Sequence, residues 1–156
     1  MYLLTVILLM LVLPAGSIWA EHSYFHSALP LLWLVGRWFV FWSAGVRLFL
    51  AGLRQFFQPE FTARQIFQIK EDAVLPIVRE LGVANFSIGI VAMISLATPA
   101  FVFPVAIYAA LFYGIAGIRH IAGKDRSRNE TIAMISDLLV SLVFAAFVVC
   151  TAANLG

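Results

Sequence analysis

Five stretches of this chain are long and apolar enough to cross a lipid bilayer, which leaves few folds open to it. Each stretch supplies about the 20 apolar residues that a membrane-spanning helix needs. Apolar residues make up 63% of the chain and charged residues only 12%, so a water-soluble domain of this composition could not cover its own core. The runs are continuous rather than alternating, which favours helices over a transmembrane β-barrel. The predicted spans are residues 2–20, 30–53, 74–97, 101–121 and 131–153.

At 156 residues the chain is predicted to form one all-α domain, an integral membrane bundle of five transmembrane helices. We expect the first span to be a retained anchor, because no Lys or Arg precedes it and its apolar run exceeds the ~7–15 residues of a signal peptide. A cleaved first helix would leave four spans. Gln58-Pro59-Glu60 is typical of a helix start, which predicts a short interfacial helix before the third span. Its residues fit a helix in the headgroup region, a helix packed under the bundle, or a docking surface for a partner.

Positive charge is concentrated in two of the connections between spans. The other two connections carry no Lys or Arg. Five crossings place the two basic connections on the same side, and the positive-inside rule makes that side cytoplasmic. We therefore expect a multi-pass membrane protein with its N-terminus in the cytoplasm and its C-terminus outside. The basic residues are Arg54, Arg64 and Lys70 in one connection and Arg119, Lys124, Arg126 and Arg128 in the other.

Several polar side chains fall inside the predicted spans, where an ionisable group costs roughly 2.5–3.5 kcal/mol unless it finds a partner or water. Counting from the span ends places six of them at similar depth toward the cytoplasmic leaflet. We expect Arg47 to pair with Glu80 or Asp137, and His120 and Tyr113 to border the same pocket. The competing interpretation is that these groups only lock the helix register. The predicted ligand-binding or polar cluster is Arg47, Glu80, Asn85, Tyr113, His120 and Asp137.

The opposite half of the bundle holds two weaker signals. Arg37 has no acid at its own depth, so we expect Glu21 to reach toward it, the guanidinium to snorkel outward, or an anionic lipid or ligand to bind it. His22 and His26 are four residues apart and would share a helix face, as metal ligands do. Without a third ligand they are weak candidates, and no metal site is predicted.

The motifs of well-known reactions are missing from this sequence. It has no Gly-rich phosphate loop, no His-Glu-x-x-His pair and no Ser/His/Asp nucleophile set. Its basic residues do not alternate with aromatic ones, which argues against nucleic acid as a partner. We expect a non-enzymatic protein that lies in the lipid bilayer and binds a lipid-like ligand or a partner subunit. A homo-oligomer is a further possibility. The alternatives are a transporter or channel component that relays ions or protons through Glu80, His120 and Asp137, and an enzyme acting on lipid or quinone. Nothing indicates a cofactor.

Two helices carry a pattern that resembles a known family. The pattern is Glu80-Leu-Gly-Val-Ala-Asn85, followed after an apolar stretch by Gly117-Ile-Arg-His120. It is similar to the E-x-G-x-A-N … G-x-x-H pattern of a family of small bacterial polytopic membrane proteins of unknown function. The resemblance implies a compact helical bundle and brings no known reaction. It marks Glu80, Gly82, Asn85, Gly117 and His120 as the positions that match the family motif.

Overall fold

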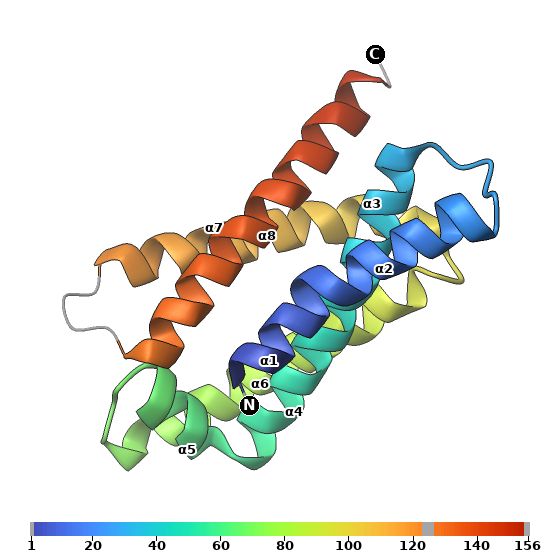
Figure 1. The fold of residues 1–156 in the computed structure, drawn as a ribbon. Helices are drawn as coiled ribbons and strands as arrows, with labels where there is room; N and C mark the ends of the chain where they lie inside the picture. The colour runs from blue at the N-terminus through green and yellow to red at the C-terminus, as the bar shows by residue number, and fades with distance from the viewer. Residues whose placement is uncertain (1, 123–126, 155–156) are drawn as a thin grey trace.

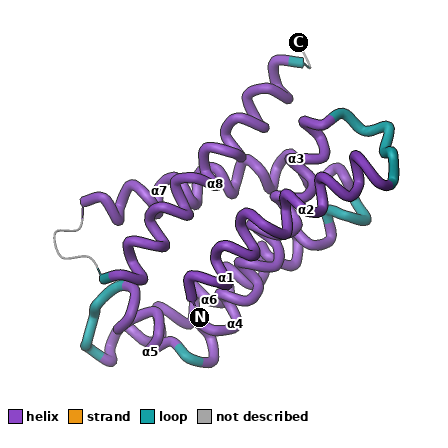
Figure 2. Tube along the Cα trace, in the orientation of Figure 1, coloured by secondary structure: helices purple, strands orange, loops and turns teal. Residues whose placement is uncertain are grey.

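The computed structural model describes residues 2–122 and 127–154, and this part of the chain contains helices and no strand (Figures 1 and 2). The predicted all-α fold class is confirmed. Every helix boundary lies within four residues of the predicted span. The five helices that are long and apolar enough to cross a membrane are Tyr2–Tyr24, Leu31–Phe57, Asp72–Ile94, Pro99–Ile121 and Arg128–Ala153.

The first two of these helices change repeatedly between α-helical and π-helical turns. No sequence pattern predicts this irregularity, although Pro14 indicates a bend in the first span. In chain order their segments are α1 (Tyr2–Ile7), π-helical η1 (Leu8–Val12), α2 (Leu13–Trp19), π-helical η2 (Ala20–Tyr24), α3 (Leu31–Phe39), π-helical η3 (Val40–Val46) and α4 (Arg47–Phe57).

Pro14 explains the first of these π-helical turns. Its ring removes the backbone N–H that would continue the hydrogen-bond ladder, and local π-helical turns are one way in which membrane helices accommodate proline. The Leu13 amide donates to the Leu8 carbonyl, five residues back. At the same spacing, the amide that would donate to the Leu9 carbonyl is that of residue 14. Pro14 cannot donate to it. The Ser43 hydroxyl from η3 donates to the Leu9 carbonyl instead, at 3.3 Å.

The remaining three long helices are more regular. Two of them begin with a 3-10 turn, and the last begins at a serine cap whose hydroxyl accepts the Glu130 amide. They are η5 (Asp72–Val74) with α6 (Leu75–Ile94), η6 (Pro99–Phe101) with α7 (Val102–Ala122), and α8 (Arg128–Ala153).

Glycine brings α4 and η3 into backbone contact with α6. A Cβ atom on Gly89 would lie 2.6 Å from the Phe49 amide nitrogen and 2.9 Å from the Gly45 carbonyl oxygen. A Cβ atom on Gly82 would lie 2.8 Å from the Gly52 carbonyl oxygen. The glycines therefore meet in antiparallel pairs seven residues apart on each helix, and any larger residue would separate the two helices. Small residues allow such close approach between membrane helices.

α7 packs against α8 in a similar way, except that the glycines of α7 face side chains of α8 and not other glycines. Gly114 faces Ser141, whose hydroxyl donates to the Ala110 carbonyl at 2.8 Å, and Gly117 faces Leu138. Apolar residues from all five long helices meet in the core between these two helix pairs. That core includes Val6, Met10, Val40, Ala44, Leu48, Ala92, Ala106, Ala109, Val140, Phe144 and Phe147.

The predicted short helix is present as α5 (Pro59–Phe61) continued by π-helical η4 (Thr62–Ile66). It contacts α4, α6 and α8, so it packs under one end of the bundle (Figure 1). We call this the basic end, because Arg54, Arg64, Lys70, Arg119 and Arg128 lie there. The N-terminal residue of α1 lies near this end and the C-terminus of α8 at the other. The buried residues of the short helix are Pro59, Thr62, Ala63 and Ile66.

Candidate functional site: a buried polar cluster behind an apolar crevice

A buried ion pair joins α4 to α8. Arg47 Nη2 lies 2.8 Å from Asp137 Oδ1, and the two side chains are only 15% and 9% exposed. Asp137 is the tenth residue of a 26-residue helix, which places it roughly 13 Å from the basic end. This depth is well inside the membrane-spanning part of the bundle, where charged side chains persist only in pairs or beside water. Of the two partners expected for Arg47, the structure shows Asp137.

Tyr113 of α7 completes this cluster. The Arg47 guanidinium carbon lies 4.8 Å from the centre of the Tyr113 ring, a cation–π distance. The Tyr113 hydroxyl donates to the backbone carbonyl of Ser43 at 2.6 Å. Where η3 returns to α-helix, the Arg47 amide donates to the Ala44 and Trp42 carbonyls and not to the Ser43 carbonyl between them. The Ser43 carbonyl can therefore accept from Tyr113. The π-helical turn thus creates the acceptor that a fully buried tyrosine needs.

The cluster connects four of the five long helices. Ser43 accepts from Tyr113 and donates to Leu9, which joins the second span to the fourth and the first. Tyr2 of α1 lies within electrostatic reach of Arg47, so its hydroxyl belongs to the same surroundings. Through Arg47 and Asp137 the fifth span is joined as well. A polar network of this kind fixes how these helices are rotated against one another.

Of the other predicted cluster residues, His120 lies within electrostatic reach of Asp137 and contacts a carboxylate at the basic end. His120 Nδ1 is 3.1 Å from Glu130 Oε1, and Gln68 donates to the other oxygen of that carboxylate at 3.1 Å. This contact joins the end of α7, the start of α8 and the segment after η4 at the basic end. His120 contacts Glu130 and Tyr113 donates to the Ser43 carbonyl, so the two side chains are held by different groups.

Asn85 and Glu80 belong to α6, on different faces of it. Asn85 is buried against α4 and donates to Gln55 Oε1 at 2.8 Å, while its own carbonyl oxygen has no partner among the described residues. Glu80 is exposed and makes no hydrogen bond or ion pair within residues 2–122 and 127–154. The structure thus brings together Arg47, Tyr113 and Asp137 and places Glu80 and Asn85 outside their cluster.

At the opposite end, Glu21 reaches Arg37, as one of the expectations had it. Arg37 Nη1 lies 2.8 Å from one Glu21 oxygen, and the Trp38 indole donates to the other at 2.6 Å. These contacts tie the first span to the second. His22 and His26 are exposed, and among the described residues no three His, Cys, Asp or Glu side chains are grouped closely enough to hold a metal ion.

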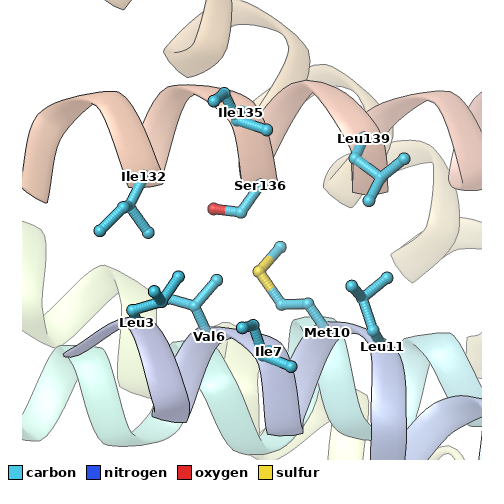
Figure 3. A pocket seen from close by; sticks show the side chains of 9 residues that line it. All are labelled: Leu3, Val6, Ile7, Met10, Leu11, Ile132, Ile135, Ser136 and Leu139. Atoms are coloured by element: carbon cyan, nitrogen blue, oxygen red, sulfur yellow. The ribbon is translucent and has the colours of Figure 1, made fainter. Parts of the chain in front are cut away.

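An apolar crevice opens between the first and fifth spans. Side chains from α1 and η1 face side chains from the first half of α8 across it (Figure 3). Its volume is about 160 Å³, and its walls expose no polar atom. The Ser136 hydroxyl is turned away from solvent because it donates to the Ala133 carbonyl at 2.9 Å. The lining residues are Leu3, Val6, Ile7, Met10, Leu11, Ile132, Ile135, Ser136 and Leu139.

The polar cluster lies directly behind this crevice. Arg47 interacts with Tyr2 on α1 and with Asp137 on α8, and these two helices form the two walls. Asp137 also follows Ser136 in the sequence, one of the residues in the middle of the crevice (Figure 3). The inner side of the crevice is thus held by an ion pair and its outer side is open.

Comparison with known proteins identifies a family and no function. Residues 1–155 match the model of a family of unknown function, DUF6790. The chain belongs to this family. No curated protein and no solved structure matches it. Membership confirms the resemblance to a family without a known reaction that was inferred from the sequence. The five apolar helices make this DUF6790 member a multi-pass membrane protein.

Sequence reasoning missed two contributors to this site, Ser43 and the crevice, and one contact at the basic end. Glu130, the partner of His120, follows Ser127 in a Ser-x-x-Glu capping pattern, which is a recognisable signal for a helix start. Ser43 gave no signal, because its role depends on a π-helical turn. The crevice gave none either, since its apolar residues look the same in sequence as those that face lipid or core.

Proposed function

We propose that this protein binds a lipid-like ligand, with an apolar chain of that ligand lying in the crevice between α1 and α8. The observation that carries the proposal is the crevice itself, which has a volume of about 160 Å³ and no polar atom on its walls. Apolar cavities of about 150 Å³ stay free of water and accept small apolar molecules. A ligand group inside this crevice must therefore be hydrocarbon.

The length and position of the crevice fit one leaflet. From Leu3 to Leu11 the helix rises roughly 12 Å, which is close to half of the ~30 Å hydrocarbon core of a bilayer. The crevice begins near the basic end and stops near the middle of the bundle. An acyl chain of the leaflet at the basic end has this length and this environment.

The polar cluster has a supporting part in this proposal. Arg47 and Asp137 hold α8 to α4 on the side facing away from the crevice, and Tyr113 holds α7 in the same network. Because α8 is fixed from behind, it does not have to close onto α1 to be stable. The cluster then maintains the crevice and does not itself contact the ligand.

The proposed orientation follows from the charge of the connections. The basic end faces the cytoplasm of a bacterial cell, the protein lies in the inner membrane, the N-terminus is cytoplasmic and the C-terminus is outside. The crevice then belongs to the cytoplasmic leaflet. Single-cysteine labelling tests this orientation. Gln68→Cys and Ser27→Cys are made separately in a Cys150→Ala background, and intact cells are treated with a membrane-impermeant thiol reagent. Labelling of Gln68→Cys alone would contradict the orientation.

Photo-cross-linking tests the binding of a chain in the crevice. The purified protein is placed in nanodiscs containing phosphatidylcholine with a diazirine in its acyl chain, and the labelled residues are mapped by mass spectrometry. We expect labels on the crevice faces of α1 and α8. Ser136→Leu places bulk in the crevice and should reduce this labelling several-fold. Ala146→Leu adds similar bulk to an exposed position of the same helix and should leave it unchanged. Equal labelling of the two variants would overturn the proposal.

A second occupant and a second function are separated by further measurements. A partner helix or a second copy in the crevice would exclude the lipid, so crevice labels would be lost and native mass spectrometry would show a complex with a second chain. The transporter alternative is favoured by the buried Arg47–Asp137 pair, since intramembrane ionisable groups often form proton relays. pH-dependent flux in proteoliposomes that is lost in Asp137→Asn and unaffected by Ser136→Leu would support transport and contradict the proposed binding function.

A further inference from the structure

Arg128 lies at the mouth of the crevice. It is the first residue of α8 and stands four residues before Ile132, seven before Ile135 and eleven before Leu139. Residues at these spacings share one face of a helix, so Arg128 continues the crevice wall by one turn, roughly 6 Å, toward the basic end. Its side chain is exposed and makes no hydrogen bond or ion pair within the described parts of the chain.

The acid closest to Arg128 within α8 does not neutralise it. Glu130 is two residues further on, which places its side chain on nearly the opposite face of the helix. Its two oxygens are held by His120 and Gln68. Within residues 2–122 and 127–154 the guanidinium of Arg128 is therefore an unpaired cation, at the end of the apolar crevice that reaches the headgroup region.

We propose that the occupant of the crevice is an anionic phospholipid of the leaflet at the basic end, with its chain between α1 and α8 and its phosphate bound by Arg128. This inference rests on the proposed function and adds the class of headgroup. A guanidinium presents parallel N–H donors that match two phosphate oxygens. The crevice offers no polar atom to a headgroup, so selectivity has to come from its mouth. Anionic lipids are also the ones enriched in the cytoplasmic leaflet.

Competition between two lipids tests the headgroup. Nanodiscs receive equal amounts of phosphatidylglycerol and phosphatidylcholine with the same diazirine-bearing chain, and the ratio of the two adducts on crevice residues is measured. One basic residue near a membrane surface favours anionic lipid by about fivefold. We expect the wild-type ratio to be about five and the Arg128→Gln ratio to fall to about one. Arg119→Gln removes the same charge from an exposed position of α7 at the same end and should keep the wild-type ratio.

The outcomes separate this inference from the function on which it rests. Crevice labelling by both lipids at a ratio near one in the wild type would overturn the headgroup inference and leave chain binding intact. An equal fall in Arg128→Gln and Arg119→Gln would also overturn it, because the preference would then come from the overall charge of the basic end. Absence of crevice labels from both lipids would reject the proposed function itself. Thermal unfolding midpoints equal to that of the wild type show that both variants are folded.

Discussion

The contact between α4 and α6 and the contact between α1 and α8 represent two extremes within one small bundle. At the first contact, Gly52 faces Gly82 and Gly45 faces Gly89, so the two backbones touch. At the second contact, leucine, isoleucine and methionine side chains face each other and leave a crevice of about 160 Å³. The first contact excludes any third molecule, and the second one has room for hydrocarbon.

The difference shows what holds helices together when lipid is the solvent. Lipid tails are as apolar as leucine, so no hydrophobic driving force favours one helix over lipid as a neighbour. Close backbone packing and hydrogen bonds remain, and both are found between α4 and α6. Between α1 and α8 the described residues show no glycine contact, and a lipid chain competes with helix packing there on equal terms.

The largest effect is expected from removing the ion pair that holds α8 in place. Asp137→Leu leaves Arg47 buried without its partner, which costs about 3–5 kcal/mol of unfolding free energy. The double variant Arg47→Leu/Asp137→Leu removes both charges and should recover most of this loss. Unfolding free energies measured in mixed detergent micelles check both values. A single variant that loses less than about 1 kcal/mol would show that the pair does not hold α8.

The next largest effect concerns the glycine contact. A Cβ atom on Gly89 would meet only backbone atoms of the facing helix, which cannot move aside, so Gly89→Ala should destabilise by about 1–3 kcal/mol. The matched control is Gly16→Ala, because a Cβ atom there meets nothing within 4 Å. This control should be neutral or gain up to about 1 kcal/mol from the higher helix propensity of alanine. Equal effects of the two substitutions would remove the basis of the comparison.

A smaller effect is expected from the hydrogen bond at the same interface. Asn85→Ala deletes the donor to Gln55 and should lower the unfolding free energy by about 0.6 kcal/mol, the average for hydrogen bonds between membrane helices. Gln55→Ala removes the same bond from the other side and serves as the control. A loss in Asn85→Ala that is as large as that in Gly89→Ala would mean that polar bonding, rather than backbone contact, maintains this interface.

The smallest effect is expected at the crevice. Leu139→Ala truncates a side chain that is 42% exposed, and surrounding lipid or detergent can fill the space, so the loss should stay within about 0.5 kcal/mol. Leu48→Ala truncates a side chain that is only 2% exposed in the core and should cost about 2 kcal/mol or more. The ratio of these two values measures how open the crevice is, and similar losses would indicate that it is closed.

The helices could be predicted from the sequence because hydrophobic length is a local property. The same holds for the start of α5 at Pro59. The membership of a family without a known reaction could also be predicted, and the family model matches residues 1–155. The site was predicted less completely. Arg47, Tyr113 and Asp137 meet as a cluster, whereas Asn85 bonds Gln55, His120 contacts Glu130 and Glu80 is exposed. Depth follows from counting residues, but the direction of a side chain depends on helix rotation.

The sequence by itself determined that this is an all-α membrane protein with five crossings and one basic end, because the bilayer sets the length of a span and the sign of the flanking charge restricts its orientation. The tertiary structure decided which polar groups meet and where the bundle stays open. Two π-helical turns rotate the first two spans and release the Leu9 and Ser43 carbonyls, whose partners lie on other helices. Such rotations accumulate over a whole span, so no local pattern could choose Asp137 over Glu80 as the partner of Arg47 or predict a crevice between α1 and α8.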